Sequence, residues 1–101
     1  MHALTAGAVV LLAANSWLFD LKVRLKSAPD DVEAFVVRQA SCNHFLGEPP
    51  FNEERAAFLD RTIRELRCDK LTQEEEQLRR VHRDNPAALR LLDDAVDIGP
   101  W

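Results

Sequence analysis

The stretch CNHFLGEPP, residues 42–50, separates two helical patterns. It holds one of the two cysteines of the chain and one of its three histidines. Pro49 and Pro50 cannot continue a helix, because proline lacks an amide donor and restricts the residue before it. The chain therefore has to change direction here, and the elements on either side of this stretch decide the fold.

The residues before this stretch have the pattern of a helix. Pro29 suits a first helical turn, and Asp30 and Asp31 complement the positive end of a helix dipole. Apolar residues then recur at intervals of three and four, and Cys42 lies seven residues after Phe35, on the same face. This pattern predicts a helix from about Pro29 to Asn43.

The residues after the stretch predict a second helix that ends near Cys68. Asn52 is a good N-cap, and Phe51 in front of it is placed to pack on Ala56 as a hydrophobic staple. Thr72 with Glu75 has the form of a capping box and predicts a third helix. Asn85 followed by Pro86 predicts a fourth.

The composition favours helices throughout. The chain has three glycines, no tyrosine and many residues that favour helices over strands. Residues 20–26 alternate polar and apolar, but the chain offers no second strand to pair with them, so we expect a linker or a helix extension. We predict an all-α fold of three or four short helices in one compact domain, residues 20–101. A net charge of −4 without a clustered basic face argues against binding to nucleic acid.

Residues 1–19 carry no charged side chain and are expected to form a hydrophobic leader. The apolar run at residues 3–14 has the length of the apolar region of a signal peptide, and the small residues before position 17 allow cleavage after Ser16. This predicts a periplasmic location. The alternative is an inner-membrane anchor that uses residues 3–19, because basic residues follow it. A core helix is the remaining alternative.

The two cysteines are predicted to form a disulfide. An export-like leader favours oxidation of a cysteine pair, and a loop of 27 residues from Cys42 through Cys68 would add roughly 3–4 kcal/mol of stability. In antiparallel helices the bond would require the linker at residues 44–51 to fold back across the pair, whereas a near-perpendicular crossing would bring the two helix ends together more easily. Two separate reduced thiols remain the alternative.

A thiol-redox or zinc-binding protein is the other chemistry that these residues allow. Cys42, His44, Cys68 and His82 have the composition of a Cys₂His₂ site, but their spacing differs from that of known sites. We therefore expect no metal, no cofactor and no catalytic residue.

His44 and Glu48 fit a structural lock better than catalysis. A histidine at a helix C-terminus gains from the helix dipole, and Glu48 can pair with it or with an arginine. Phe45 and Phe51 are expected to pack beneath this pair.

These residues also resemble a family of small, uncharacterised exported proteins from proteobacteria. The pattern is a Cys-x-His-Phe-x-Gly-Glu core, followed by an arginine and a second cysteine. It matches the core at residues 42–48, with Arg55 and Cys68 after it, and the resemblance covers about residues 30–95. It implies a periplasmic domain that bears a disulfide and follows a leader, and it implies no activity.

The expected function is a non-enzymatic periplasmic or envelope protein that binds a protein partner, of the inhibitor, immunity or accessory type. The candidate surface is the loop from Cys42 to Phe51, since rigidly held loops commonly carry recognition. Its residues, which serve either as an interaction site or as a structural lock, are His44, Phe45, Gly47, Glu48, Phe51 and Arg55.

Overall fold

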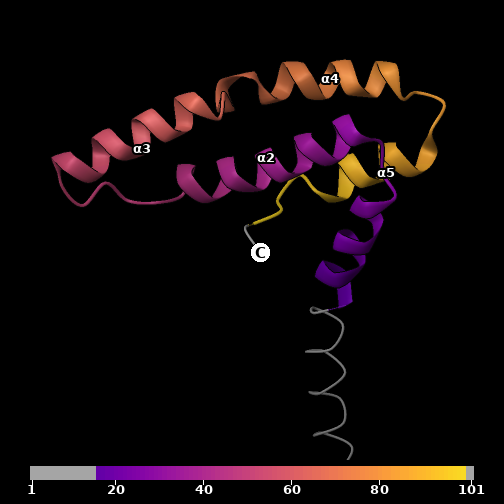
Figure 1. Cartoon of the computed structure of the whole chain (residues 1–101), viewed down its shortest axis with the longest axis horizontal. Helices are drawn as coiled ribbons and strands as arrows, with labels where there is room; N and C mark the ends of the chain where they lie inside the picture. The colour runs from indigo at the N-terminus through magenta and orange to yellow at the C-terminus, as the bar shows by residue number, and fades with distance from the viewer. Residues whose placement is uncertain (1–15, 100–101) are drawn as a thin grey trace, which may run out of the picture.

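The structure is a computed structural model that describes residues 16–99, and within that range it is helical with no strand (Figure 1). Residues 16–26 are helical, and the elements that follow are α2 (Asp30–Leu46), α3 (Glu53–Glu65), the 3₁₀ turn η1 (Cys68–Lys70), α4 (Leu71–Val81) and α5 (Pro86–Asp94). The predicted all-α fold is confirmed. The predicted leader falls largely on residues 1–15, which lie outside the described range.

Helix α2 is the centre of the arrangement. It contacts α3, α4 and α5. Figure 1 shows α3, η1 and α4 following one another in a long layer that runs back along α2, while α5 and residues 16–26 lie on the other side of α2. The polypeptide therefore leaves α2 at Leu46, turns in the linker at residues 47–52, and returns along the whole length of α2.

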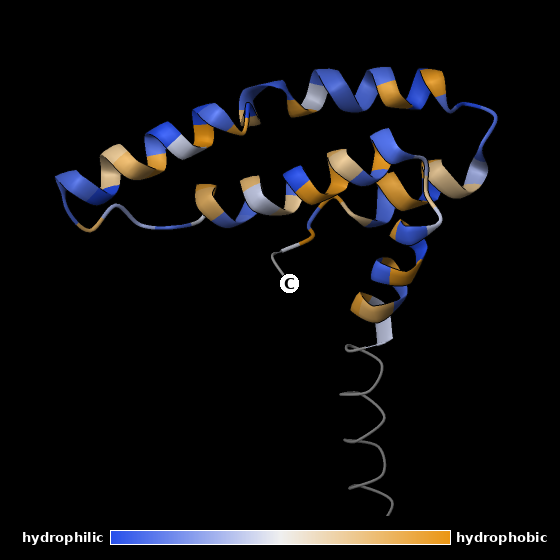
Figure 2. Cartoon of the chain, in the orientation of Figure 1, coloured by the Kyte–Doolittle hydropathy of each residue, from blue (hydrophilic) through white to orange (hydrophobic). Residues whose placement is uncertain are grey.

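The hydrophobic core gathers at one end of this arrangement. Helix α2 contributes Val32, Phe35, Val36 and Ala40 to it, and the other buried members come from residues 16–26, from α5 and from the turn after α5: Leu21, Leu25, Ala88, Leu91, Leu92, Ala95 and Ile98. Figure 2 shows that hydrophobic and hydrophilic residues alternate along the helices. Helix α3 adds nothing to this cluster, and Leu59 is its one buried residue.

Residues 20–26 belong to a helix, which confirms one of the two expectations for them. Leu21 and Leu25 lie four residues apart, so both face the core, where they are almost completely buried. The alternation of polar and apolar residues therefore reflects a helix with apolar residues on two sides.

Among the starts of α3, α4 and α5, the local sequence predicts the caps of α3 and α5 correctly but not that of α4. The side chain of Asn52 accepts a hydrogen bond from the Arg55 amide at 2.8 Å, and Asn85 accepts one from Ala88 at 3.1 Å, as expected of N-caps. The predicted capping box at Thr72 is wrong. Helix α4 begins at Leu71 without a side-chain cap, because η1 leads directly into it and places Thr72 inside the first turn.

Candidate functional site

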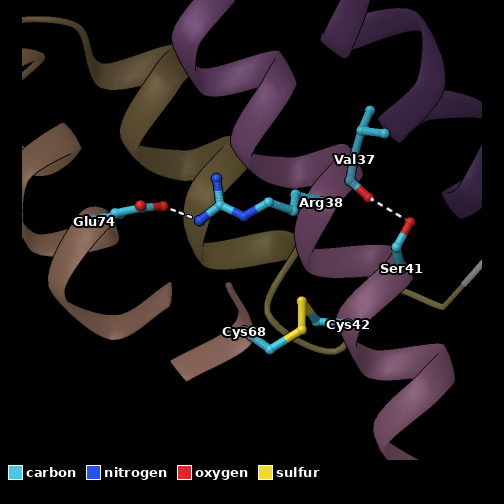
Figure 3. Close-up of a disulfide and its surroundings, with 6 residues drawn as sticks. All are labelled: Val37, Arg38, Ser41, Cys42, Cys68 and Glu74. Atoms are coloured by element: carbon cyan, nitrogen blue, oxygen red, sulfur yellow. Dashed lines mark hydrogen bonds and ion pairs between the residues drawn. A yellow bond between two sulfur atoms is a disulfide. The ribbon is translucent and has the colours of Figure 1, made fainter. Parts of the chain in front are cut away.

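The disulfide predicted between Cys42 and Cys68 is present, with a Cα–Cα distance of 5.7 Å (Figure 3). Cys42 lies four residues before the end of α2, and Cys68 opens η1. The linker runs onward past the end of α2, and α3 then returns alongside it. The return of α3, and not a fold of the linker across the helices, brings the sulfur atoms together.

The backbone between α3 and η1 turns sharply at Arg67. This residue has a φ of 55°, in the left-handed region that residues other than glycine avoid. The turn ends α3 and directs Cys68 toward α2. The disulfide holds this conformation, because Cys68 directly follows Arg67 and is bonded to a buried cysteine of α2.

Glu48 joins the end of α2 to the beginning of α3. One carboxylate oxygen lies 2.8 Å from Nε2 of His44, and the other is paired with the guanidinium of Arg55. The side chain of Glu48 is 23% exposed, so this ion pair is partly shielded from water. The three predicted residues therefore meet in one contact, which we name the Glu48 lock.

An aromatic contact lies beside the lock. The rings of Phe45 and Phe58 meet edge to face with centroids 6.2 Å apart, and the Arg55 guanidinium lies 4.9 Å from the Phe58 ring centre. Phe58 is absent from the residues predicted from sequence. Phe58 lies three residues after Arg55, so both side chains are on one face of the helix. This spacing is the feature of the sequence from which the contact could have been predicted.

Phe51 does not pack beneath the lock, and this prediction is wrong. Its side chain is 78% exposed, and Ala56, its expected staple partner, is also exposed. Pro49 and Pro50 keep the linker out of the helix, so Phe51 stays outside the first turn of α3. Leu46, at the end of α2, is likewise 59% exposed.

Gly47 follows α2 as its C-cap. Its φ is −87°, and its amide donates to the carbonyl of His44, so the turn needs no left-handed residue. A Cβ at this position would lie 3.4 Å from the Asn43 carbonyl oxygen, which is close to ordinary contact. Neither the backbone conformation nor the space around Gly47 therefore requires a glycine at this position. We name residues 44–55, which include the lock and the exposed Leu46 and Phe51, the tip.

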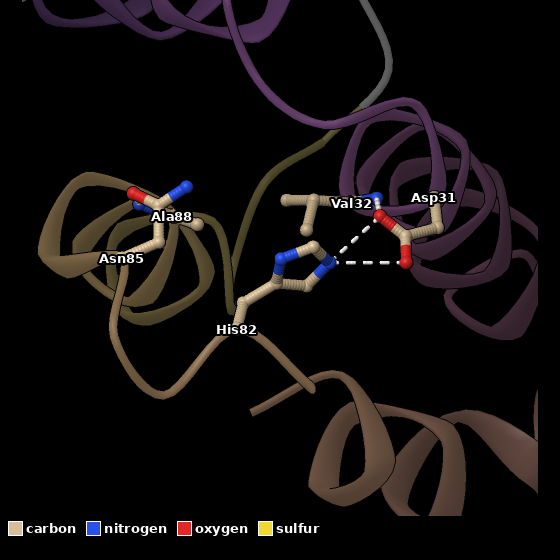
Figure 4. A network of polar contacts seen from close by, with 5 residues as sticks. All are labelled: Asp31, Val32, His82, Asn85 and Ala88. Atoms are coloured by element: carbon tan, nitrogen blue, oxygen red, sulfur yellow. Dashed lines mark hydrogen bonds and ion pairs between the residues drawn. The ribbon is translucent and has the colours of Figure 1, made fainter. Parts of the chain in front are cut away.

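The four residues of the alternative zinc site do not come together. The cysteines are bonded to each other, and Nε2 of His82 lies 2.9 Å from Asp31, near the opposite end of α2 from His44 (Figure 4). Positions 31 and 44 of α2 are about 20 Å apart along the helix axis. Residues 16–99 contain no group of three histidine, cysteine or acidic side chains arranged to hold a metal ion.

A groove between α2 and α4 is a site that the sequence did not reveal. It has a volume of about 380 Å³, and the residues lining it include Phe35, Leu78 and the exposed Val81. The ion pair between Arg38 and Glu74 joins its two sides, and Asp31, which also lines it, contacts the His82 ring. The hydrogen bond from the His82 ring holds the pKa of Asp31 below its ordinary value. The thin apolar stripe of α4 was the signal for this groove, because a helix with few apolar residues leaves part of its neighbour uncovered.

Comparisons with known proteins found no match to this chain. No protein-family model matches it, and neither a curated protein nor a solved structure does. The resemblance to exported proteobacterial proteins therefore stays a prediction. Among residues 16–99, no helix has both the length and the apolar character needed to cross a membrane.

Proposed function

We propose that this chain is a non-enzymatic protein of the bacterial envelope that binds a partner protein through its tip. One observation carries the proposal: Phe51 exposes 78% of its side chain on a segment that is held at both ends. Exposed aromatic side chains on rigid supports are the residues that most often supply binding energy in protein interfaces, because they bury a large area at a small entropic cost.

The support beneath the tip comes from two contacts. The disulfide fixes the end of α3 to α2, and the Glu48 lock fixes the beginning of α3 to the same helix. The linker between Gly47 and Asn52 thus spans two anchored helix ends. A partner that buries Phe51 and Leu46 would meet a loop that is already ordered, which lowers the entropic cost of association.

The polar residues of the tip suit a binding role better than a chemical one. One carboxylate oxygen of Glu48 contacts the His44 ring and the other pairs with the Arg55 guanidinium, and His44 also contacts the Phe45 ring. The contacts between these side chains stabilise the conformation of the loop. The tip thus combines these charged residues with the exposed apolar side chains of Leu46 and Phe51, and protein interfaces likewise combine apolar and polar residues.

The envelope location is supported by the cysteine pair and by the uncharged run at residues 3–14. Disulfides persist in oxidising compartments such as the periplasm. Cleavage after Ser16 would leave Leu21 and Leu25 in the mature chain, and both are needed for the core. Retention of residues 3–19 as an anchor would leave the same core intact.

Site-specific photocrosslinking in the native host tests the proposal. A photoreactive benzoylphenylalanine replaces Phe51 in one chain and the exposed Arg61 of α3 in a matched control. We expect one saturable crosslinked species from position 51 and none from position 61. Excess wild-type protein should suppress that species, and a Leu46→Ala/Phe51→Ala chain should not. Equal crosslinking from both positions, or none from position 51, would overturn the proposal.

A further inference from the structure

We infer that Cys68 is a site of thiol–disulfide exchange, at which a small thiol of the glutathione type becomes covalently attached while Cys42 is released. The two sulfur atoms of the bond differ in access. Cys42 is completely buried on α2, whereas Cys68, at the start of η1, is partly exposed. Because exchange depends on which sulfur atom a thiolate can reach, the attack should occur at Cys68.

The exchange step conserves atoms and electrons. The glutathione thiolate attacks Sγ of Cys68 and forms a new S–S bond with it, while the bond to Cys42 breaks and its electron pair leaves on Sγ of Cys42. One disulfide and one thiolate are consumed, and one of each is produced. The product carries glutathione on Cys68 and a thiolate on Cys42, so the step requires no other oxidant or reductant.

A buried donor lies beside the sulfur atom that leaves. Arg38 is four residues before Cys42 on α2, and Figure 3 shows its side chain and the disulfide on the same side of that helix. The guanidinium of Arg38 pairs with Glu74, but its Nε is buried and has no hydrogen-bond partner. Buried donors are nearly always paired. A thiolate on Cys42 would supply the missing acceptor, and Arg38 would thereby stabilise the leaving group.

The residue before Cys68 also favours opening of the bond. Arg67 has a φ of 55°, a conformation that is unfavourable for a residue with a side chain, and cleavage of the disulfide allows it to relax. Burial and the charge of Arg67 hold the pKa of Arg38 below its ordinary value, so the two guanidinium groups are close enough to interact. Cations near a cysteine stabilise its thiolate, and a more stable thiolate leaves faster.

The core does not prevent this step. Cys68 and α3 lie outside the core cluster, which is formed by residues 16–26, α2, α5 and the turn after α5. Release of Cys68 therefore leaves the buried apolar residues in place, and exchange can proceed from the folded chain. The inference concerns the disulfide alone and does not rest on the proposed partner of the tip.

The first test maps the adduct on the oxidised full chain. Reduced glutathione is added under native conditions, and exchange is stopped at early times with acid, followed by N-ethylmaleimide in denaturant. Trypsin separates the two cysteines into residues 39–55 and 68–70. We expect the mass shift of glutathione on the peptide of Cys68 and that of N-ethylmaleimide on the peptide of Cys42, with about tenfold more glutathione on Cys68 than on Cys42.

Two matched variants test the role of Arg38. Arg38→Met and Glu74→Gln both remove the ion pair between these residues, but only the first removes the Nε donor. We expect Arg38→Met to slow the appearance of the adduct by about tenfold, because a hydrogen bond to a charged group is lost, and Glu74→Gln not to slow it. Circular dichroism shows that each variant retains its helices.

The inference fails if the folded chain forms no adduct. It also fails if Cys42 and Cys68 carry equal amounts of glutathione, since exchange would then proceed through an unfolded chain in which both sulfur atoms are open to attack. Equal slowing by Arg38→Met and Glu74→Gln would contradict the role of Arg38, because the ion pair and not the Nε donor would then control the rate.

Discussion

The two ends of α2 are held by different means. At its beginning, Val32, Phe35 and Val36 pack against residues 16–26 and α5 in a continuous apolar core. At its other end, α2 meets α3, which has a single buried residue, Leu59. There the contacts are a disulfide, the Glu48 lock and the Phe45–Phe58 ring pair. We call the first region the core end and residues 44–68 the arm.

The difference shows how a short chain supports an exposed loop. A domain of this size buries enough apolar surface for one compact core, and that core covers only part of α2. The arm extends beyond it and depends on a covalent bond and on charges. Because the core does not extend to the tip, Leu46 and Phe51 remain exposed there, where the proposed partner would contact them.

The largest expected effect comes from a cavity at the core end. Leu92→Ala truncates a side chain that is completely buried and should lower the free energy of unfolding by about 2–5 kcal/mol. Leu46→Ala removes the same atoms from a half-exposed position in the arm and should cost less than about 1 kcal/mol. Urea unfolding followed by circular dichroism measures both. Equal losses would mean that the arm and the core end are packed alike.

Loss of the disulfide should have the next largest effect, and it should fall on the arm. Cys42→Ala/Cys68→Ala removes the covalent constraint that closes a loop in the unfolded chain. Because the unfolded chain then gains conformational entropy, the free energy of unfolding should fall by up to roughly 3–4 kcal/mol. Because α3 contributes no residue to the core cluster, it should lose its order before the core end does. Reduction of the wild-type disulfide is the matched control, and a melting temperature that stays unchanged after reduction would contradict the account.

A smaller effect is expected from the lock. Glu48→Gln keeps the shape of the side chain but removes the charge that His44 and Arg55 share, and should cost about 1 kcal/mol because the contact is only partly exposed. Asp60→Asn breaks the Asp60–Arg64 pair on the same helix, where both side chains are more than half exposed, and should cost nearly nothing. A double-mutant cycle with Arg55→Gln isolates the coupling. A coupling free energy between Glu48 and Arg55 that is no larger than the one between Asp60 and Arg64 would show that the lock does not stabilise the arm.

The smallest effect is expected at the core end, from the contact between Asp31 and His82. The pKa of Asp31 lies below its ordinary value of 3.8, chiefly because of the hydrogen bond from the His82 ring. The folded chain therefore binds this proton less readily than the unfolded chain does. The stabilisation is present above about pH 4 and is lost as the pH falls through the lowered pKa.

Because half of the Asp31 side chain is exposed, this contribution should stay below about 1 kcal/mol. Asp31→Asn should reduce the fall in stability between pH 5 and pH 2, approximately the range in which a carboxylate of this kind titrates. Asp30→Asn, at the same helix end, serves as the control. An unchanged pH profile for Asp31→Asn would show that the contact does not stabilise the fold.

The features that the sequence predicted correctly depend on short segments or on covalent chemistry. Asn52 and Asn85 cap helices because a side chain reaches an amide three residues away, which is independent of the rest of the fold. The disulfide was predicted from the presence of two cysteines and an export-like leader, and not from their placement in the fold. The Glu48 lock required only that His44 lie four residues before Glu48 and that Arg55 lie in the first turn of α3.

The features that failed depend on tertiary placement. Thr72 has the local pattern of a cap, but η1 precedes it without a gap and puts it inside the helix. Phe51 has the local pattern of a staple, but the extended Pro49-Pro50 linker keeps it away from Ala56. The groove between α2 and α4 and the contribution of Phe58 depend on how α3 and α4 return along α2, which periodicity alone does not define.

Amide hydrogen exchange of the oxidised and reduced chains, compared residue by residue, tests the central claim most directly. The account predicts that reduction of Cys42–Cys68 lowers protection throughout α3 while protection in α5 and in the first half of α2 persists, because the core end does not depend on the arm. Equal loss of protection in α3 and α5 would contradict it, since the arm and the core end would then unfold as one unit.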